Sequence, residues 1–417
     1  RGSRRIVSAS AMRDDCRDRP RARRHRLPRW MGVVAITTLL AGCSDASPTS
    51  GVDIGSVLRS QWQARYAGVD IGGLTAVVIT PAGESFASTV PGTTLATHFR
   101  GASTTKTFTA AAIMLLDQRG QLKIDDVLTA AMPGTSGKPY LPATPGFDIP
   151  YKSRITIRQL LQHRAGVFDV ANTDISAGVK APYAGRRYVV WALEQDDDHT
   201  FSPDEMIGVV ASNQLSASPP GTRFEYCDTG YSVLAKIVEQ VSGKPFAQFL
   251  ADELLVPNGL ADTTFPDLGT TIRLPEPFIE GWLRLGGEDR NVTLQNVSSG
   301  MGDGNVVTTT ADLSRWFRRL LRGEAGVDPR QVARMRECMP TGSEFVRSYG
   351  LGLECYPAAF GQGHNGGNPG YLTVARHDVD ADVTVVLFST LADYDHAAAT
   401  TEWLYDTVAK VRAAAGS

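Results

Sequence analysis

The most informative hydrophobic pattern lies in residues 99–116, FRGASTTKTFTAAAIMLL. From Phe108 to Leu116 the apolar residues recur every three or four positions, which is the spacing of one face of a helix. We therefore predict a turn that enters a helix at Ser103, with Lys106 one helical turn later on the same face. That arrangement brings an ammonium group within reach of a hydroxyl.

Strand patterns gather near the two ends of the chain, whereas helical patterns fill its middle. Runs rich in β-branched and aromatic residues predict strands from residue 75 onward and again in residues 349–356, 371–377 and 382–390. Helical spacing with capping residues and glycine stops predicts a helix that begins at Ser202 and others in residues 157–166, 233–243, 246–255, 311–323 and 397–413.

One sheet built from both ends of the chain follows from this order. Its strands would come from residues of about 57–125 and 300–417, and residues of about 126–299 would form a mostly helical lobe. We predict that 57–417 is one such α/β (α+β) domain. A cleft where the two lobes meet would collect side chains from distant parts of the sequence, which is a common place for an enzyme site.

Residues 167–200 are polar, and we expect an irregular surface insertion that can act as a lid over the site. The acidic run from Asp196 to Asp198 is typical of a solvated charge cluster. Arg186 and Arg187 fit a surface role, and contact with a substrate carboxylate is the alternative.

The first 43 residues have the pattern of an export signal. An arginine-rich segment precedes the apolar run MGVVAITTLLAGC at residues 31–43, which is too short to span a bilayer. Its end, LAGC, resembles a bacterial lipoprotein signal, in which Cys43 would become the lipidated N-terminus and tether the protein to a membrane. Residues 44–56 are small and polar and are predicted to form a flexible tether.

The composition is ordinary for a globular protein, so it excludes few classes of function. With 417 residues, 42% of them hydrophobic, and a net charge of −2, the chain gives no indication of nucleic-acid binding. No H-x-H-x-D or H-E-x-x-H pattern occurs, so we expect neither a metal nor another cofactor. In an exported protein we expect Cys338 and Cys355 to form a disulfide, and Cys227 to be a small packed side chain.

Ser103 and Lys106 form an S-x-x-K pattern with a chemical rationale. An isolated serine hydroxyl is a weak nucleophile, and a nearby ammonium group together with the electropositive start of a helix can activate it. Free N–H groups at that helix start can also stabilise a developing oxyanion. Because so short a pattern also arises by chance, the rest of the chain has to support it. The G-x-S-x-G pattern of α/β-hydrolases does not occur.

Two further stretches fit such a site. One is Tyr226-Cys227-Asp228, ahead of a predicted helix, and the other is the glycine-rich GHNGGNPG at residues 363–370. With the Ser103 motif they resemble, in order, the three motifs of the serine β-lactamase and penicillin-binding-protein superfamily. The likeness is greatest to the class C branch, which includes D-alanyl-D-alanine carboxypeptidases, D-amino-acid peptidases and related esterases. It implies a β-lactamase/transpeptidase-like fold with an antiparallel sheet flanked by helices.

The resemblance implies a role for each residue of the first two motifs. Ser103 would be the nucleophile that forms an acyl-enzyme, and Lys106 would hold the hydroxyl and assist its deprotonation. Tyr226 would act as general base and later as acid to the leaving group. Two nearby cations, an ammonium and an imidazolium, would lower the pKa of this phenol toward the working range.

The third motif would bind the substrate and the oxyanion. His364 and Gly366 match the H-x-G form that replaces the K-T-G of the β-lactamases proper. His364 would then be a weaker, pH-dependent cation for a substrate carboxylate. The backbone N–H groups of Ser103 and Gly367 would form the oxyanion hole.

Asp228 departs from the family pattern, which has asparagine at this position. An asparagine amide can donate a hydrogen bond to a substrate carbonyl, whereas an ionised aspartate cannot. Together with His364, this difference argues against an efficient β-lactamase and favours a peptidase or an esterase.

We therefore expect an extracytoplasmic, lipid-anchored serine hydrolase, or a secreted one if Cys43 is not lipidated. D-alanyl-D-alanine carboxypeptidase action on peptidoglycan stem peptides is the first hypothesis, based on family analogy and location. An esterase or amidase acting on small acyl substrates, or a β-lactamase of the same family, is the alternative enzyme. A penicillin-binding or scaffold domain without turnover is the alternative from another class, with Asp228 as its best support.

Overall fold

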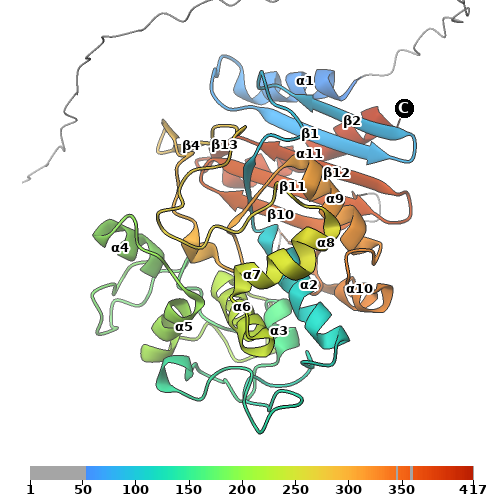
Figure 1. Ribbon diagram of the computed structural model, residues 1–417. Helices are drawn as coiled ribbons and strands as arrows, with labels where there is room; N and C mark the ends of the chain where they lie inside the picture. The colour runs from blue at the N-terminus through green and yellow to red at the C-terminus, as the bar shows by residue number, and fades with distance from the viewer. Residues whose placement is uncertain (1–52, 344–345, 357–359, 417) are drawn as a thin grey trace, which may run out of the picture. The chain divides into compact units, whose positions relative to one another are not determined.

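Figure 1 shows the computed structural model, which describes residues 53–343, 346–356 and 360–416. The chain divides into a unit of residues 1–49 and one compact unit of residues 50–417. The predicted presequence, with Cys43, lies outside the described residues. The predicted tether was wrong at its end, because helix α1 (Ile54–Tyr66) already begins there: the Asp53 side chain accepts hydrogen bonds from the first free backbone N–H groups.

A sheet of eight strands forms the larger part of the fold, in the order β2-β1-β12-β11-β10-β9-β8-β7. Every neighbouring pair in it is antiparallel. The strands are β1 (Leu74–Thr80), β2 (Gly83–Ser88), β7 (Met339–Pro340), β8 (Ser348–Tyr349), β9 (Glu354–Cys355), β10 (Gln362–Asn368), β11 (Tyr371–Asp378) and β12 (Val383–Ser389). Both ends of the domain therefore contribute to one sheet, because the apolar strand patterns lie at those ends.

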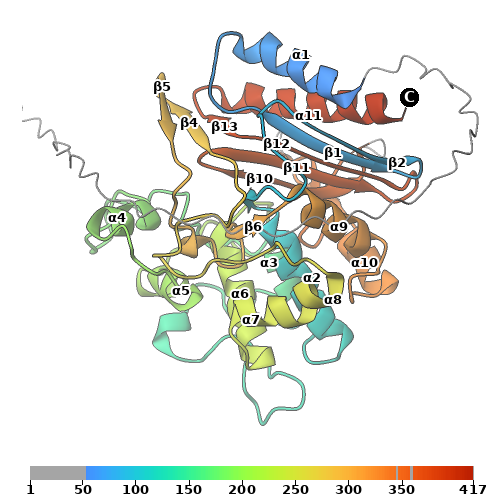
Figure 2. The same ribbon diagram turned by 45° about the horizontal axis from the view of Figure 1, so that its top comes forward.

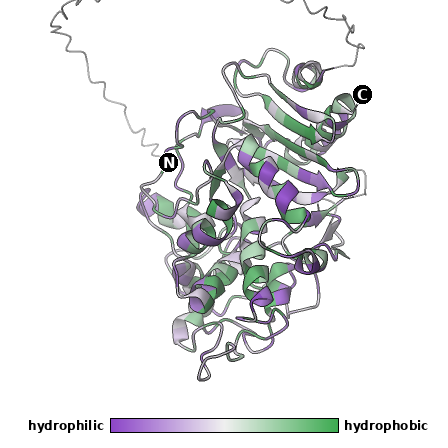
Figure 3. Ribbon diagram, turned by 45° about the vertical axis from the view of Figure 1, so that its right-hand side comes forward, coloured by the Kyte–Doolittle hydropathy of each residue, from purple (hydrophilic) through white to green (hydrophobic). Residues whose placement is uncertain are grey.

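Helices cover both faces of this sheet, and they come from different parts of the chain. Figure 2 shows α1 and α11 (Ala397–Ala415) together on one face, with α9 (Thr310–Leu321) on the other. Leu58, Leu404 and Val408 of the first pair pack on strand residues such as Val78 in a hydrophobic cluster of their own. The strands carry long hydrophobic stretches between these layers (Figure 3).

The middle of the chain is mostly helical and loop-rich. Its elements are the short 3-10 turn Pro145–Phe147, α3 (Ile157–Leu161), α4 (Tyr188–Gln195), α5 (Pro203–Ser212), α6 (Asp228–Ser242), α7 (Phe246–Leu250), a π-helical turn (Ala251–Leu255), α8 (Val256–Asn258), β4 (Trp282–Leu285), β5 (Glu288–Asn291) and the 3-10 turn Ser298–Gly300. Two elements nearer the C-terminus are α10 (Pro329–Met335) and β13 (Leu391–Asp393), and β13 extends β4 and β5 into a three-stranded sheet. None of the described helices is long and apolar enough to cross a bilayer.

The expectation that residues 167–200 are irregular was wrong in part, because they contain α4. Tyr188 and Ala192 on this helix are buried, and Trp191 packs against Tyr183 with the ring centres 5.5 Å apart. The apolar residues of YVVWALEQ have helical spacing, which the polar character of the surrounding segment obscured.

The predicted helix after Ser103 is α2 (Thr105–Gln118), and it runs through the core between the sheet and the helical region. All its residues from Thr105 to Leu116 are buried. Phe108 stacks on Trp316 of α9 with the ring centres 4.0 Å apart. Strand β3 (Phe99–Ala102), directly before the helix, pairs with β6 (Val306–Thr308). Ser103 therefore follows a strand and precedes a buried helix.

A close approach of β10 to β3 explains one glycine of the third motif. A Cβ atom at Gly366 would collide with the backbone oxygen of Gly101, whereas one at Gly367 would meet Leu372 at an ordinary 3.4 Å. We predict that Gly366→Ala lowers the free energy of unfolding by roughly 1–3 kcal/mol, because the strands must separate to relieve this collision. Gly367→Ala, the matched control, should change it by less than about 1 kcal/mol. Denaturant unfolding of both variants measures the difference, and equal stabilities would contradict the prediction.

Candidate active site

Ser103 lies in the tight turn between β3 and α2, where two hydrogen bonds fix the backbone. The Thr105 hydroxyl donates to the backbone oxygen of Ala102 at 2.7 Å and accepts from the backbone N–H of Val306 at 2.9 Å. Ala102 has a φ of +48°, a left-handed conformation that non-glycine residues rarely adopt. The turn leaves the Ser103 side chain partly exposed at the start of a buried helix.

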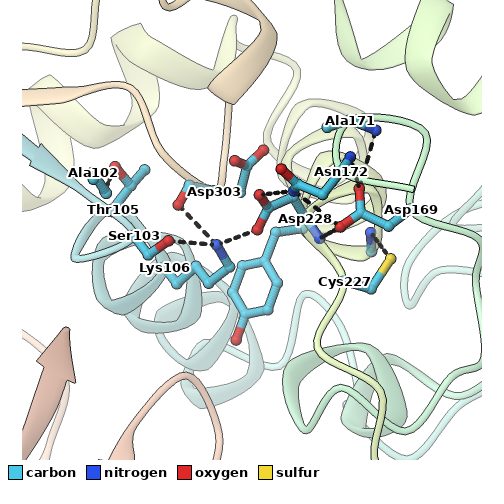
Figure 4. A network of polar contacts seen from close by, with 12 residues as sticks. Ala102, Ser103, Thr105, Lys106, Asp169, Ala171, Asn172, Cys227, Asp228 and Asp303 are labelled. Atoms are coloured by element: carbon cyan, nitrogen blue, oxygen red, sulfur yellow. Dashed lines mark hydrogen bonds and ion pairs between the residues drawn. The ribbon is translucent and has the colours of Figure 1, made fainter. Parts of the chain in front are cut away.

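Lys106 is fully buried, and its ammonium group has three partners from separate parts of the chain (Figure 4). It donates to the Ser103 hydroxyl at 3.2 Å, to Asp228 Oδ1 at 2.7 Å and to the backbone oxygen of Asp303 at 3.0 Å. Burial lowers the pKa of Lys106, but its acidic surroundings, above all the Asp228 carboxylate, outweigh this effect and raise the pKa well above its ordinary value. Lys106 is therefore an ammonium ion, which stabilises negative charge on Ser103.

Tyr226 precedes α6 and lies against the same ammonium group. Lys106 Nζ is 4.8 Å from the centre of the Tyr226 ring, and the phenol interacts with the side chains of Ser103 and Lys106. The His163 ring packs on this tyrosine at 4.2 Å, and His163 Nδ1 accepts the backbone N–H of Cys227. These contacts hold the phenol beside the nucleophile.

The expected lowering of the pKa of Tyr226 was wrong. Burial raises the pKa well above its ordinary value, and the neighbouring Asp228 raises it further, whereas Lys106 lowers it by less. The expectation considered only the nearby cations, because the sequence does not show how deeply the Tyr226 phenol is buried. The phenol is therefore protonated at neutral pH.

Asp228 lies in a hydrogen-bond network whose neighbouring groups are donors, so a side chain that only accepts hydrogen bonds suits this position. Its second carboxylate oxygen accepts a hydrogen bond from the Asn172 side chain at 2.7 Å, while its first pairs with Lys106. Its backbone N–H donates to Asp169 Oδ2 at 3.2 Å. Only 19% of the Asp228 side chain is exposed. The carboxylate therefore serves as the counter-ion of Lys106.

Sequence reasoning missed three residues of this network, namely Asp169, Asn172 and Asp303. Asp169 and Asn172 fall in the segment expected to be a surface insertion, and no local pattern marks them. Asp303 had a usable signal, because it stands between glycines in the sequence GMGDGN. One of these, Gly302, has a φ of +92° and lies close to the backbone of Tyr231, so it suits a tight turn into the site.

His364 is completely buried, and the expectation that it is a cation was wrong. Its Nε2 lies 2.9 Å from the Tyr349 hydroxyl, and its Nδ1 is 3.7 Å from Glu354. Burial lowers the pKa of His364 to about 4, with Lys106 acting in the same direction and Glu354 opposing it. The imidazole is therefore neutral at pH 7. Gly366 and Gly367 follow it on β10, paired with β11.

Two cavities meet at Ser103 and Gly367. The larger one, of about 610 Å³, is lined by both residues and by polar side chains that include Asp228 and Asp303. The smaller one, of about 370 Å³, is lined by Ser103, Gly367, Tyr226 and mainly apolar groups such as Leu372 and Leu404. A scissile bond at Ser103 would thus have one part of its substrate in each cavity.

The structure joins Cys338 and Cys355 in a disulfide, with the Cα atoms 6.3 Å apart. Cys227 is buried and free, and its sulfur accepts the backbone N–H of Gly230 at 3.3 Å. Within residues 53–343, 346–356 and 360–416, no group of three or more His, Cys, Asp or Glu side chains is arranged to hold a metal ion.

Comparison with known proteins identifies the family. The model of the family described as Beta-lactamase matches residues 63–409. The chain belongs to the beta-lactamase family. The predictions of this family, of its fold and of a serine hydrolase are thereby confirmed.

Individual relatives of this beta-lactamase family member are distant. Penicillin-binding protein 4* of Bacillus subtilis (strain 168) is 25% identical over 309 residues, which cover 70% of this chain and 60% of that protein. The D-alanyl-D-alanine-carboxypeptidase/endopeptidase AmpH of Escherichia coli (strain K12) is 24% identical over 285 residues, covering 67% and 64%. The chain thus matches less than two thirds of the length of each.

A solved structure shares the fold. The D-amino acid amidase from Ochrobactrum anthropi SV3, complexed with D-phenylalanine, superposes with a TM-score of 0.69 at 22% identity. The match covers 87% of this chain and 98% of that one.

We predict that the imidazole of His364 titrates with a midpoint near pH 4. NMR of isotope-labelled histidine side chains would follow it, with His364→Asn to assign the resonance. Because the unfolded chain binds this proton more tightly, the associated stabilisation is complete above pH 6.5 and diminishes as the pH falls toward 4. A midpoint above pH 6 would contradict the buried, neutral imidazole.

Proposed function

We propose that this beta-lactamase family member hydrolyses amide bonds through an acyl-enzyme on Ser103. The observation that carries the proposal is the buried Lys106 ammonium, 3.2 Å from the Ser103 hydroxyl and locked by Asp228 at 2.7 Å. This fixed charge stabilises the serine oxygen as it becomes negative. The Ser103 hydroxyl also faces two cavities that can hold the two parts of a substrate.

In the proposed acylation, the Ser103 oxygen forms a bond to the substrate carbonyl carbon while the carbon–nitrogen bond breaks. The serine proton passes to the Tyr226 oxygen, and the phenol proton passes to the leaving nitrogen. This relay suits a tyrosine with a raised pKa, because no free tyrosinate has to exist beforehand. In deacylation, water attacks the ester carbonyl carbon, the bond from this carbon to the Ser103 oxygen breaks, and a proton of the water passes through Tyr226 to the Ser103 oxygen.

The oxyanion formed in both steps needs hydrogen-bond donors. We assign this role to the backbone N–H groups of Ser103 and Gly367, since both residues line the two cavities. Gly366, beside Gly367, allows β10 to approach β3, and that approach supports this arrangement.

The first candidate substrate is a peptidoglycan stem peptide that ends in D-alanyl-D-alanine. The names of two relatives support it, because one is a penicillin-binding protein and the other a D-alanyl-D-alanine-carboxypeptidase/endopeptidase. The predicted lipoprotein signal ending at Cys43 supports the same candidate. It would tether the enzyme to the outer face of a bacterial membrane, where such peptides occur.

The second candidate substrate is a small D-amino-acid amide. The acidic lining of the larger cavity favours it, since such an amide carries a free ammonium group. The fold likeness to a D-amino acid amidase agrees with this candidate. The neutral His364 also leaves the third motif without the expected cation for a terminal carboxylate.

We predict that intact protein incubated with benzylpenicillin gains the mass of one penicillin and that Ser103→Ala does not. Ser299→Ala removes another serine of the same cavity and should still be acylated, which makes it the matched control. Hydrolysis of p-nitrophenyl acetate is measured in parallel. If the protein forms no adduct and no Ser103-dependent ester hydrolysis occurs, the proposed catalysis is refuted. A stable adduct without turnover of any ester or amide would instead favour a penicillin-binding domain.

We predict that Tyr226→Phe lowers kcat for a p-nitroanilide substrate by about 10²–10⁴-fold, because the leaving nitrogen loses its proton donor. Tyr349→Phe removes a neighbouring buried phenol that bonds to His364 and should change kcat by less than about tenfold. Steady-state kinetics of both variants compare the two effects. Equal losses would show that the Tyr226 hydroxyl is not the proton carrier.

A further inference from the structure

We propose that the larger cavity binds a primary ammonium group in the acyl part of the substrate, with the Asp303 carboxylate as its main contact. The inference deepens the proposed function and rests on it. It concerns which substrates the acyl-enzyme site accepts, and it assigns Asp303 as a residue that determines specificity.

The wall of this cavity carries an excess of negative charge. Asp197, Asp198, Asp228 and Asp303 line it, and Arg187 is the cation of its lining. The Arg187 side chain is 52% exposed and lies 3.9 Å from Asp174, so it is directed to the rim and is partly compensated there. The inner part of the cavity, near Ser103, is therefore acidic.

Three carboxylates lie near Lys106, and they differ in how many hydrogen bonds the protein donates to them. Asp169 accepts hydrogen bonds from three backbone N–H groups and from the Asn172 side-chain amide. Asp228 pairs with Lys106 and accepts from Asn172. The Asp303 carboxylate accepts no hydrogen bond from any described residue, because Lys106 contacts only its backbone oxygen.

Asp303 is nevertheless only 5% exposed, although it lines the cavity. A largely buried carboxylate to which the protein supplies no donor is poorly compensated. Burial raises the pKa of Asp303 well above its ordinary value, and the charge of Asp228 raises it further. A bound ammonium ion would supply both the missing donors and the missing positive charge.

The charge of the cluster leads to the same conclusion. Three acidic side chains, those of Asp169, Asp228 and Asp303, surround one ammonium, that of Lys106, and the charge of Asp228 disfavours ionisation of the other two. A substrate carboxylate in this cavity would add to the repulsion, whereas a substrate ammonium would reduce it. A primary ammonium also has three N–H donors, enough to contact Asp303 and neighbouring oxygens together.

The position of Tyr226 shows which part of the substrate the acidic cavity would hold. Tyr226 lines the smaller cavity and is absent from the lining of the larger one. Because Tyr226 passes its proton to the leaving nitrogen, the leaving group must lie in the smaller cavity. The acyl part then extends into the larger cavity, toward Asp303.

Two pairs of substrates test the proposal. The two members of each pair differ in one ammonium group, which acetylation removes. The first pair is D-alanine p-nitroanilide and N-acetyl-D-alanine p-nitroanilide, in which acetylation removes an α-ammonium group. The second pair is Nα-acetyl-L-lysyl-D-alanyl-D-alanine and its Nα,Nε-diacetyl form, in which acetylation removes a side-chain ammonium group. For each pair, the measured quantity is the kcat/KM of the amine divided by that of its acetylated form.

We expect this ratio to exceed about ten for at least one pair in the wild-type protein, and to fall at least about tenfold in Asp303→Asn. A preference limited to the first pair identifies an α-ammonium group, and one limited to the second identifies a side-chain ammonium group. Asp198→Asn, which removes a charge at the cavity rim, should change the ratio less than twofold because its field is screened by water.

A ratio near one for both pairs in the wild type, or a ratio that Asp303→Asn leaves unchanged, would overturn the proposal. Equal effects of Asp303→Asn and Asp198→Asn would also overturn it, because they would indicate a general field instead of a contact. Thermal unfolding checks that Asp303→Asn is folded, and the isosteric amide keeps the backbone contact to Lys106. Failure of the proposed function gives a different result from failure of the ammonium site. If Ser103 is not the nucleophile, hydrolysis of these substrates persists in Ser103→Ala.

Discussion

The buried ammonium group of Lys106 is the interaction on which the rest of the site depends. A charge removed from water must be compensated by its surroundings, and here the partners come from three separate regions: the turn after β3, the start of α6 and the loop before β6. Satisfying Lys106 therefore requires α6 and the segments next to β3 and β6 to be correctly assembled around α2. The same contacts that stabilise this charge hold Ser103 in place.

This one charge also explains the protonation states around it. Lys106 is positive and Asp228 is its counter-ion, while burial keeps the Tyr226 phenol protonated and the His364 imidazole neutral. The site thus has a single fixed cation beside the nucleophile and an acidic wall on one flank. Such an arrangement differs from a site with two cations, and it changes both the expected proton path and the expected sign of the substrate charge.

Local patterns in the sequence were enough to predict the helix after Ser103 and the sheet built from both chain ends, because hydrophobic spacing reports directly on α2, β11 and β12. The three motifs also led to Tyr226 and Asp228. Asp169, Asn172 and Asp303 could not be found in this way, because only tertiary structure brings them to Lys106. The pKa shifts of Tyr226 and His364 were mispredicted for the same reason, since burial is a property of the folded chain.

The pairing of β1 with β12 has a consequence for how the chain folds. In this register Leu74 lies opposite Ser389, near the other end of the sequence. A strand that needs so distant a partner cannot take its place until almost the whole chain has been synthesised, and contacts of this kind form slowly. The nascent polypeptide therefore leaves the ribosome with its sheet still open.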